Sequence, residues 1–278
     1  MSTDNLRCAP ILKEFEISKS SFYRYSSKPL HDKDYADYLL IKNIFEKRKS
    51  RVGIRQIKMI LEREKSIIMN EKKIARIKKK YGLVTKIRRK NKFKFCIKKH
   101  QEHKSVSNKL DRQFGVSEPD KVYSTDITQL NYGQSQKAYL AAFKDLCTKE
   151  IISYEVSSRM SLNLTNTATD RALKNIQQNS RLMVHSDQGM HFTHVSFRKK
   201  LKEMNIEQSM SRKGNCLDNA PIESFFGLIK DHLDLKQCTS IEEVKKMVTK
   251  EIKYYNNERP QLGLKKMPPT EYRRHLIS

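Results

Sequence analysis

Three carboxylates between residues 126 and 223 lie where they could converge on one point. Asp126 lies in a strand-like pattern, Asp187 follows a short apolar run, and Glu223 falls in the first turn of a well-marked helix. Like charges that meet oppose one another unless a cation neutralises them. Mg²⁺ accepts hard oxygen ligands, and two such ions about 3.5–4 Å apart can activate an attacking oxygen and stabilise a leaving one. The acids therefore point to phosphodiester cleavage or transfer.

Taken singly, each acid also has a purely structural explanation. Asp126 can cap a strand turn, and Asp187 can belong to a plain turn with Gln188 and Gly189. Glu223 can be an acid that the dipole at the start of a helix favours. Residue types alone leave these alternatives open.

The elements that must position the acids follow from the hydrophobic pattern. Strands are predicted over 121–130, 139–146, 150–156, 181–186 and 206–209, and helices over 161–178, 195–204, 221–235 and 241–256. Three strands, a helix, a strand and further helices indicate an α/β layer on a mixed sheet.

The N-terminal part has a different pattern. Residues 11–25 predict two short helices of a helix-turn-helix, with Ser18 capping the second and Lys19 and Arg24 outward. Apolar residues over 38–45, 54–61 and 74–81 predict a second, three-helix unit. Its third helix is expected to start after Asn70 and stop at Gly82.

Charge separates the two parts further. The chain has 57 Lys and Arg against 31 Asp and Glu, a net charge of +26, and residues 1–115 hold 32 of the basic and 12 of the acidic residues. Between Lys72 and Lys99 there are 14 basic residues and no acid. A long, unbalanced basic run favours contact with nucleic-acid phosphates, although a solvated helix face is the alternative. This charge disfavours an ordinary metabolic enzyme.

Several other kinds of site are not expected. No window approaches the ~20 apolar residues of a membrane span, and no export signal is visible, so we expect no membrane partner and a cytoplasmic, nucleoid-associated location. The five cysteines lack metal or redox spacing. His100-x-x-His103 and His191-x-x-His194 lack the Cys-x-x-Cys that a zinc module needs. No Gly-rich phosphate loop suggests ATP, and we interpret Asp145 and Asp218 as acids outside the site.

Spacing and flanking residues distinguish between the readings of the three acids. There are 60 residues between Asp126 and Asp187 and 35 between Asp187 and Glu223, and Lys230 follows Glu223 by seven positions. The strings around them are STDIT (124–128), HSDQG (185–189) and SMSRKGNCLDNAPIESFF (209–226), followed by YNNERP (255–260) and PTEY (269–272). Together they resemble the insertion-sequence transposases of the second-reading-frame (OrfB) type, which have a retroviral-integrase-like DDE catalytic core. The resemblance covers about residues 10–274.

The resemblance implies an α/β fold: an RNase H-like mixed five-stranded sheet flanked by helices and preceded by an all-α helix-turn-helix DNA-binding region. Asp126 would come from the first strand, Asp187 from the fourth and Glu223 from the helix after the fifth. All three would be catalytic and would bind two Mg²⁺ or Mn²⁺ ions. Water would cut one DNA strand at the element's end, and the freed 3′-hydroxyl would attack another phosphodiester without a covalent enzyme–DNA intermediate.

The same resemblance suggests DNA-contacting residues. Lys230 would contact DNA near the cut, although a solvated helix lysine is the alternative, and Arg212 and Lys213 would lie on a DNA-facing loop. We interpret Asn219 as a helix cap first and a functional residue second, and His185 as either a group supporting Asp187 or a packed strand histidine. The remaining predicted contacts are basic residues of the N-terminal part: Lys19, Arg24, Lys72, Lys73, Arg76, Arg88, Arg89 and Lys90.

The expected partners are double-stranded DNA, as terminal repeats and target, and an upstream-frame (OrfA) helix-turn-helix protein or its fusion to this chain. A homo-oligomer is expected in the synapse. The chain departs from the family at Leu217, where a Trp is common, and at Gln261, where a His is frequent. Two alternatives are a catalytically inactive DNA-binding or regulatory relative and an RNase H-class nuclease. The intact acids and Lys230 argue against the first, and the basic helical units against the second.

The predicted domain organisation has five parts. They are a partial helix-turn-helix (1–30), a helical DNA-binding domain (35–90), a basic linker (91–119), an RNase H-like integrase catalytic core (120–235) and a C-terminal helical tail (236–278).

Overall fold

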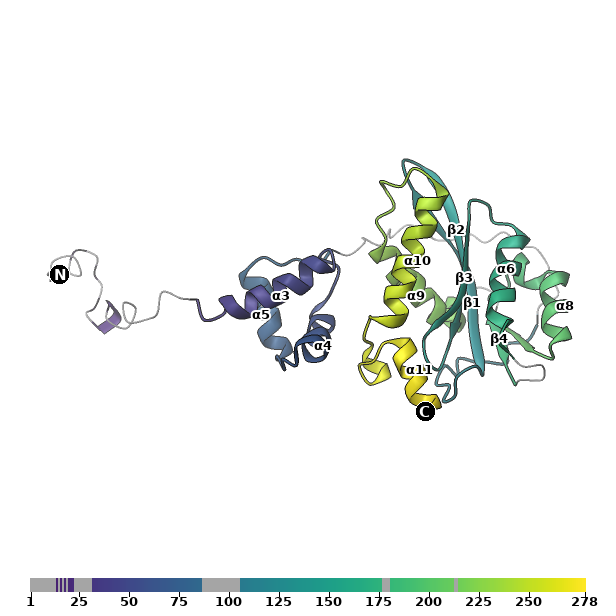
Figure 1. The fold of residues 1–278 in the computed structure, drawn as a ribbon, viewed down its shortest axis with the longest axis horizontal. Helices are drawn as coiled ribbons and strands as arrows, with labels where there is room; N and C mark the ends of the chain where they lie inside the picture. Colours follow the sequence, from purple (N-terminus) through teal and green to yellow (C-terminus); the bar gives the residue numbers. More distant parts are fainter. Residues whose placement is uncertain are drawn as a thin grey trace. The chain divides into compact units, whose positions relative to one another are not determined.

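The computed structural model describes residues 32–86, 106–176, 181–212 and 215–278, together with 14, 16, 18 and 20–22. The chain divides into two compact units, Met1–Thr85 and Lys86–Ser278 (Figure 1). The predicted helix-turn-helix at 11–25 lies largely outside the described residues. Within it, the backbone N–H of Ser21 donates to Ser18 Oγ at 3.2 Å, the contact expected of a serine cap.

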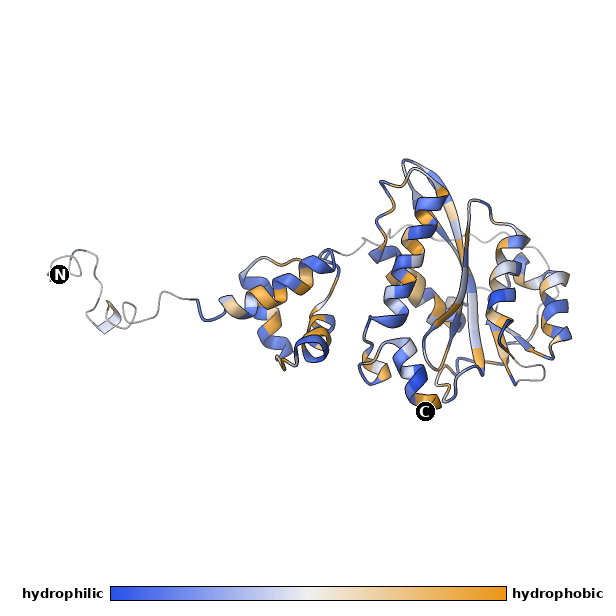
Figure 2. Cartoon of the chain, in the orientation of Figure 1, coloured by the Kyte–Doolittle hydropathy of each residue, from blue (hydrophilic) through white to orange (hydrophobic). Residues whose placement is uncertain are grey.

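The first unit contains a three-helix bundle, as predicted. Its helices are α3 (Tyr35–Lys47), α4 (Ile54–Lys65) and α5 (Glu71–Lys80). Each helix contributes at least one fully buried isoleucine to the bundle core: Ile41, Ile57 and Ile74. Figure 2 shows apolar and polar residues alternating around each helix, which is why they pack along one side only. Asn70 caps α5, since its Oδ1 accepts the backbone N–H of Lys72 at 2.8 Å.

The second unit is built on a five-stranded sheet with the order β3-β2-β1-β4-β5. Antiparallel pairing joins β1 to β2 and β2 to β3, whereas β4 runs parallel to β1 and β5 parallel to β4. Short turns suffice for the antiparallel pairs, but parallel neighbours need helical crossovers. This topology is the mixed RNase H-like sheet that we predicted. The strands are β1 (Val122–Tyr132), β2 (Gln136–Asp145), β3 (Ile151–Ser157), β4 (Met183–Ser186) and β5 (Glu207–Met210).

Helices cover both faces of this sheet (Figure 1). On one face, Tyr123 and Phe143 pack with buried residues of α6 (Leu162–Leu173) and α8 (Val195–Glu203). On the other face, Leu140 packs with buried residues of α9 (Ala220–His232) and α10 (Ile241–Asn257). Because side chains alternate along a strand, the even-numbered residues of β1 face α9. The structure adds elements that we did not predict individually: α7 (Met190–Thr193), η1 (Cys216–Asn219), η2 (Leu262–Leu264) and α11 (Pro269–Ile277).

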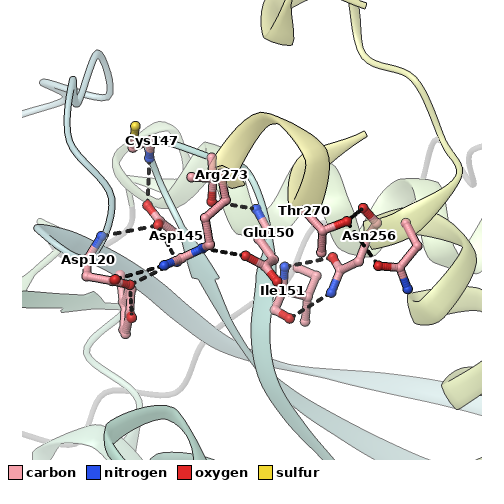
Figure 3. Close-up of polar contacts among 11 residues, drawn as sticks. Asp120, Asp145, Cys147, Glu150, Ile151, Asn256, Thr270 and Arg273 are labelled. Atoms are coloured by element: carbon pink, nitrogen blue, oxygen red, sulfur yellow. Dashed lines mark hydrogen bonds and ion pairs between the residues drawn. The ribbon is translucent and has the colours of Figure 1, made fainter. Parts of the chain in front are cut away.

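A single arginine fastens α11 to the sheet (Figure 3). The Arg273 guanidinium donates to Glu150 at 2.6 Å, to Asp120 at 2.8 Å and to Asp145 at 2.9 Å. The side chain of Asp145 is fully buried, and burial raises its pKa. Arg273 therefore neutralises carboxylates at one end of the sheet, which agrees with a structural role for Asp145.

No helix among the described ranges is both long enough and apolar enough to cross a bilayer.

Candidate active site

Asp126 and Asp187 follow paired residues of adjacent parallel strands. Thr125 lies opposite Ser186 in the β1–β4 ladder; Asp126 is the next residue of β1, and Asp187 directly follows the end of β4. Neighbouring strands lie about 4.8 Å apart, so the backbone places the two acids side by side. Both are half-buried.

Each aspartate also makes a local bond to the backbone. Asp126 Oδ1 accepts the N–H of Ile127 at 2.7 Å, and Asp187 Oδ1 accepts the N–H of Gly189 at 2.9 Å. A Cβ atom at position 189 would lie 2.8 Å from Asp187 Oδ1, too close for any residue except glycine without a shift. The turn that we considered as an alternative reading of Asp187 is therefore real, and it fixes one oxygen of this carboxylate.

The third acid, Glu223, is carried by α9, which is fastened to the sheet at both ends. At its start, Asn219 accepts from Ser124 Oγ at 2.7 Å and donates to the Thr125 carbonyl at 3.3 Å. Near its end, Lys230 donates to Thr128 Oγ1. Asn219 occupies the N-cap position of α9, as we expected, but its side chain makes no capping bond. The Asn219 side-chain amide hydrogen-bonds β1 instead.

These ties bring Glu223 level with Asp126. Four residues of helix from Asn219 to Glu223 rise about 6 Å. Two residues of strand from Ser124 to Asp126 advance about 6.6 Å, on the face of β1 towards α9. Glu223 is exposed to solvent. Asp126 and Asp187 are thus carried by neighbouring strands, and Glu223 by the helix that is tied to β1. In the described ranges, no group of three or more His, Cys, Asp or Glu side chains is already arranged as a metal site.

His185 lies opposite Ser124 in the β1–β4 ladder and is fully buried. Its Nδ1 lies 2.9 Å from Ser209 Oγ, which also accepts the backbone N–H groups of Lys109 at 3.0 Å and Leu110 at 3.1 Å. Two bonds occupy the acceptor sites of the hydroxyl, so its proton goes to Nδ1. Burial lowers the pKa of His185. It is therefore a neutral, packed strand histidine, one of the two readings that we considered.

Asp218, just before α9, is the buried acid whose role our sequence analysis missed. Its fully buried carboxylate accepts from Arg112 Nε at 2.7 Å and from Arg212 Nε at 2.9 Å. It also accepts from the backbone N–H of Arg212 at 2.9 Å and from Asn108 Nδ2 at 3.1 Å. Hydrogen bonds from Arg212 hold the pKa of Asp218 well below its usual range. Arg112 lies 106 residues away in sequence, so no local pattern could reveal the pair.

The two predicted DNA-contacting residues of the second unit that the structure describes, Arg212 and Lys230, are already engaged within the protein. Arg212 binds Asp218 while half of its side chain stays exposed, and Lys230 bonds Thr128. The other predicted contacts, apart from those on α5, lie outside the described residues: Lys19, Arg24, Arg88, Arg89, Lys90 and Lys213.

The predicted contacts on α5 are Lys72, Lys73 and Arg76, and two of them bind acids of their own unit. Lys73 forms an ion pair with Asp37 at 2.6 Å. The Arg76 guanidinium donates two hydrogen bonds of 2.6 Å to the Asp34 carboxylate.

Other basic residues of α5 are also engaged. Lys80 pairs with Asp34 at 3.0 Å. Lys78 is buried, with its Nζ 4.4 Å from the centre of the Phe45 ring. Within the described part of the unit, only Lys72 and Lys79 of α5's basic residues are exposed with no ion pair.

Known families match both units. The HTH-like domain matches residues 32–91, and two integrase core domain families match 116–216 and 204–269. The chain is 36% identical over 271 residues to the putative transposase InsK of insertion sequence element IS150 from Escherichia coli K12, which covers 95% of this chain and 92% of that protein. The chain belongs to the insertion-sequence transposases.

A second relative of the transposase, a 31 kDa protein of insertion element IS600 from Shigella sonnei, is 30% identical over 266 residues, covering 93% of this chain and 96% of that protein. Among solved structures, the catalytic core domain of HTLV-2 integrase in complex with magnesium is 16% identical with a TM-score of 0.45, over 56% of this chain and 97% of that chain. The transposase is a polynucleotidyl transferase that acts on DNA. Its integrase core family typically uses a divalent metal ion.

Proposed function

We propose that the transposase cuts and joins DNA at the ends of an insertion sequence, with Asp126, Asp187 and Glu223 as its catalytic acids. The observation that carries this proposal is the β1–β4 register, which sets Asp126 beside Asp187. The ties from α9 to Ser124 and Thr128, which hold the helix that carries Glu223 against the same strand as Asp126, support the inclusion of the third acid. A hydroxyl would attack the phosphodiester directly, first from water and then from the freed 3′ end.

Two Mg²⁺ or Mn²⁺ ions would be held by these three carboxylates. The donor set fits, because carboxylate oxygens are the hard ligands that both ions accept. Glu223 is exposed and both aspartates are half-buried, so these carboxylates are accessible to a substrate as large as DNA. When bound, the ions would activate the attacking oxygen and stabilise the leaving one.

The basic residues would bind and orient the DNA. Lys230 would leave Thr128 for a phosphate near the cut, and Arg212, already oriented by Asp218, would present its exposed edge with Lys213 to the backbone. The N-terminal unit would hold the terminal repeat. The residues proposed for that contact are Lys72, Lys73 and Arg76 of α5, with Lys19, Arg24, Arg88, Arg89 and Lys90.

The proposed assembly contains more than one chain. Two element ends must be brought together for joining, so a homo-oligomer in the synapse is proposed. An upstream-frame (OrfA) helix-turn-helix protein, separate or fused, would help to select the terminal repeats. The cytoplasmic nucleoid is the proposed place of action, since chromosomal DNA is the substrate.

Strand transfer by the purified protein tests this proposal. Labelled DNA with the ends of the encoding element is incubated with Mg²⁺ or EDTA and joined product is measured on a gel. Asp126→Asn, Asp187→Asn and Glu223→Gln should each abolish the product while gel shifts stay near wild type. Asp170→Asn is the matched control, because this exposed acid pairs with Lys200 on the other side of the sheet.

Each other result has a clear meaning. Joined product from all three acid variants would remove them from the catalytic site, and loss of DNA binding in all three would show that they support the fold or the DNA contact instead. Cut but unjoined DNA would indicate a nuclease. Binding without any reaction would be repeated with the upstream frame fused to the chain, and inactivity of that fusion as well would indicate an inactive relative.

A further inference from the structure

Asn219 is nearly fully buried at the start of the helix that carries Glu223. An asparagine at this position ordinarily bonds the free N–H groups of its own helix. Here the side chain turns away from the helix and bonds the strand below it. Such a buried amide is expected to have a specific role, because both of its polar ends must find partners away from water.

The two bonds of Asn219 join the elements that carry two of the proposed catalytic acids. The amide oxygen accepts from Ser124 Oγ at 2.7 Å, and the amide nitrogen donates to the Thr125 carbonyl at 3.3 Å. These partners are the two residues that directly precede Asp126. Asn219 itself stands one helical turn before Glu223.

A third contact holds the same helical turn from the neighbouring strand. Lys144 of β2 lies opposite Ser124 in the sheet, and its Nζ donates to the Pro221 carbonyl at 2.9 Å. The first turn of α9 is therefore held at two points, one on each of two adjacent strands. Two such points fix both the position of the helix along β1 and its rotation.

We propose that Asn219 is a positioning residue, which sets the register of α9 on β1 and thereby the separation of Glu223 from Asp126. This inference rests on the proposed role of those two acids. A slip of one residue along a helix moves a side chain by about 1.5 Å and turns it by about 100°. Displacements of about 1 Å at a reacting centre can cost about 100-fold in rate.

Only an amide suits both partners of Asn219. Aspartate would keep an acceptor for Ser124 but would place a second oxygen against the Thr125 carbonyl, without a donor between them. Alanine would leave the buried hydroxyl and the carbonyl without their partner. Ser124→Ala removes only one of the two bonds and leaves the amide in place.

The positioning role of Asn219 can be tested independently of catalysis by measuring Mn²⁺ binding to the full chain. Electron paramagnetic resonance in the absence of DNA measures this binding. Asn219→Ala should weaken Mn²⁺ binding by about 10- to 100-fold, the range for residues that orient metal ligands. The Mg²⁺ concentration for half-maximal strand transfer should rise in parallel, while DNA binding stays near wild type. Ser124→Ala should show a smaller effect in the same direction, and Asn219→Asp should not restore binding.

The matched control is Asn131→Ala, the same change at an exposed position of β1. If Asn219→Ala binds Mn²⁺ and transfers strands as wild type does, the proposal is overturned. If that variant does not fold, Ser124→Ala decides, and wild-type Mn²⁺ binding by it overturns the proposal.

Asp126→Asn separates this inference from the proposed function. If Asp126→Asn leaves Mn²⁺ binding unchanged, the acids are not the ligands and both proposals fall. If Asp126→Asn loses the ion while Asn219→Ala keeps it, only the positioning role is wrong.

Discussion

Two buried charges flank the start of α9, and they differ in how well the protein compensates them. Asp218 is surrounded by donors from Arg112, Arg212 and Asn108. Among the described residues, the Lys144 side chain hydrogen-bonds only the Pro221 carbonyl, and no carboxylate pairs with it. A buried charge stabilises a fold only when its partners outweigh the loss of water. The two residues should therefore affect stability in opposite directions.

Replacement of Asp218 by asparagine should destabilise the second unit, and the effect should depend on pH. The folded pKa lies below the ordinary value of 3.8, so the carboxylate stabilises the fold fully above that value, and this contribution is lost as pH falls through the folded pKa. Urea unfolding of wild type and Asp218→Asn should therefore differ most near pH 7 and converge below about pH 4. A difference that stays constant with pH would show that shape, and not charge, is what Asp218 contributes.

Replacement of Lys144 by methionine should stabilise the protein. Burial lowers the pKa of Lys144 to about 8 from 10.5, so the charged form is disfavoured in the folded state. After allowing for the lost bond to Pro221, the gain in the free energy of unfolding at pH 7 should be about 2 kcal/mol. The free energy of unfolding of wild type should rise towards that of Lys144→Met between about pH 8 and 10.5. In this pH range the unfolded chain binds more protons than the folded one, so a rise in pH favours the folded state.

Urea unfolding at pH 7 and pH 10 measures this change. Lys137→Met is the control, since it makes the same replacement at an exposed position of the same strand. A loss of stability at pH 7 in Lys144→Met alone would show that the bond to Pro221 outweighs the burial of the charge.

At the scale of elements, α5 shows why a basic run overstates the capacity to bind phosphate. The sequence between Lys72 and Lys99 has no acid, yet Asp34 and Asp37 reach α5 from the start of α3. Acidic residues on a helix that is distant in sequence can pair with the basic residues of α5. A count of charges along one segment does not include such pairs. The cap at Asn70, in contrast, depends on adjacent residues and was predicted correctly.

The exposed lysines of α5 should therefore carry more of the DNA affinity than its paired residues do. Lys72→Ala with Lys79→Ala should make the plot of log affinity against log salt less steep by about 1.8, because each phosphate contact contributes about 0.9. Arg76→Ala should change that slope less and should lower thermal stability, since it leaves Asp34 without its bidentate partner. Fluorescence anisotropy at several salt concentrations measures the slopes. Equal slopes for wild type and the double variant would place the DNA on another surface.

At the scale of the whole molecule, the sequence predicted elements and their order better than the contacts between them. The five strands and the helices α6, α8, α9 and α10 follow from local periodicity, and the spacing of the three acids follows from that order. The bonds that fasten these elements were not predicted. Arg273 meets Asp145 across 128 residues, and Asn219 meets Ser124 across 95. Periodicity reports which face of an element is buried, but not which polar residues meet there.

The two units have separate hydrophobic cores, so each should unfold in its own transition. Ile57 is fully buried in the core of the first unit, and Ile252 is nearly so between α10 and the sheet in the second. Replacement of a buried isoleucine by alanine costs about 2–5 kcal/mol through lost contacts and the cavity left behind.

Scanning calorimetry of the full chain should therefore show two transitions, each lowered by only one of the variants Ile57→Ala and Ile252→Ala. Between the two midpoints, Ile57→Ala should lose DNA binding while the circular dichroism of the sheet persists, because the basic helices unfold and the catalytic core does not. A single transition that both variants lower equally would show instead that the two units fold as one cooperative structure.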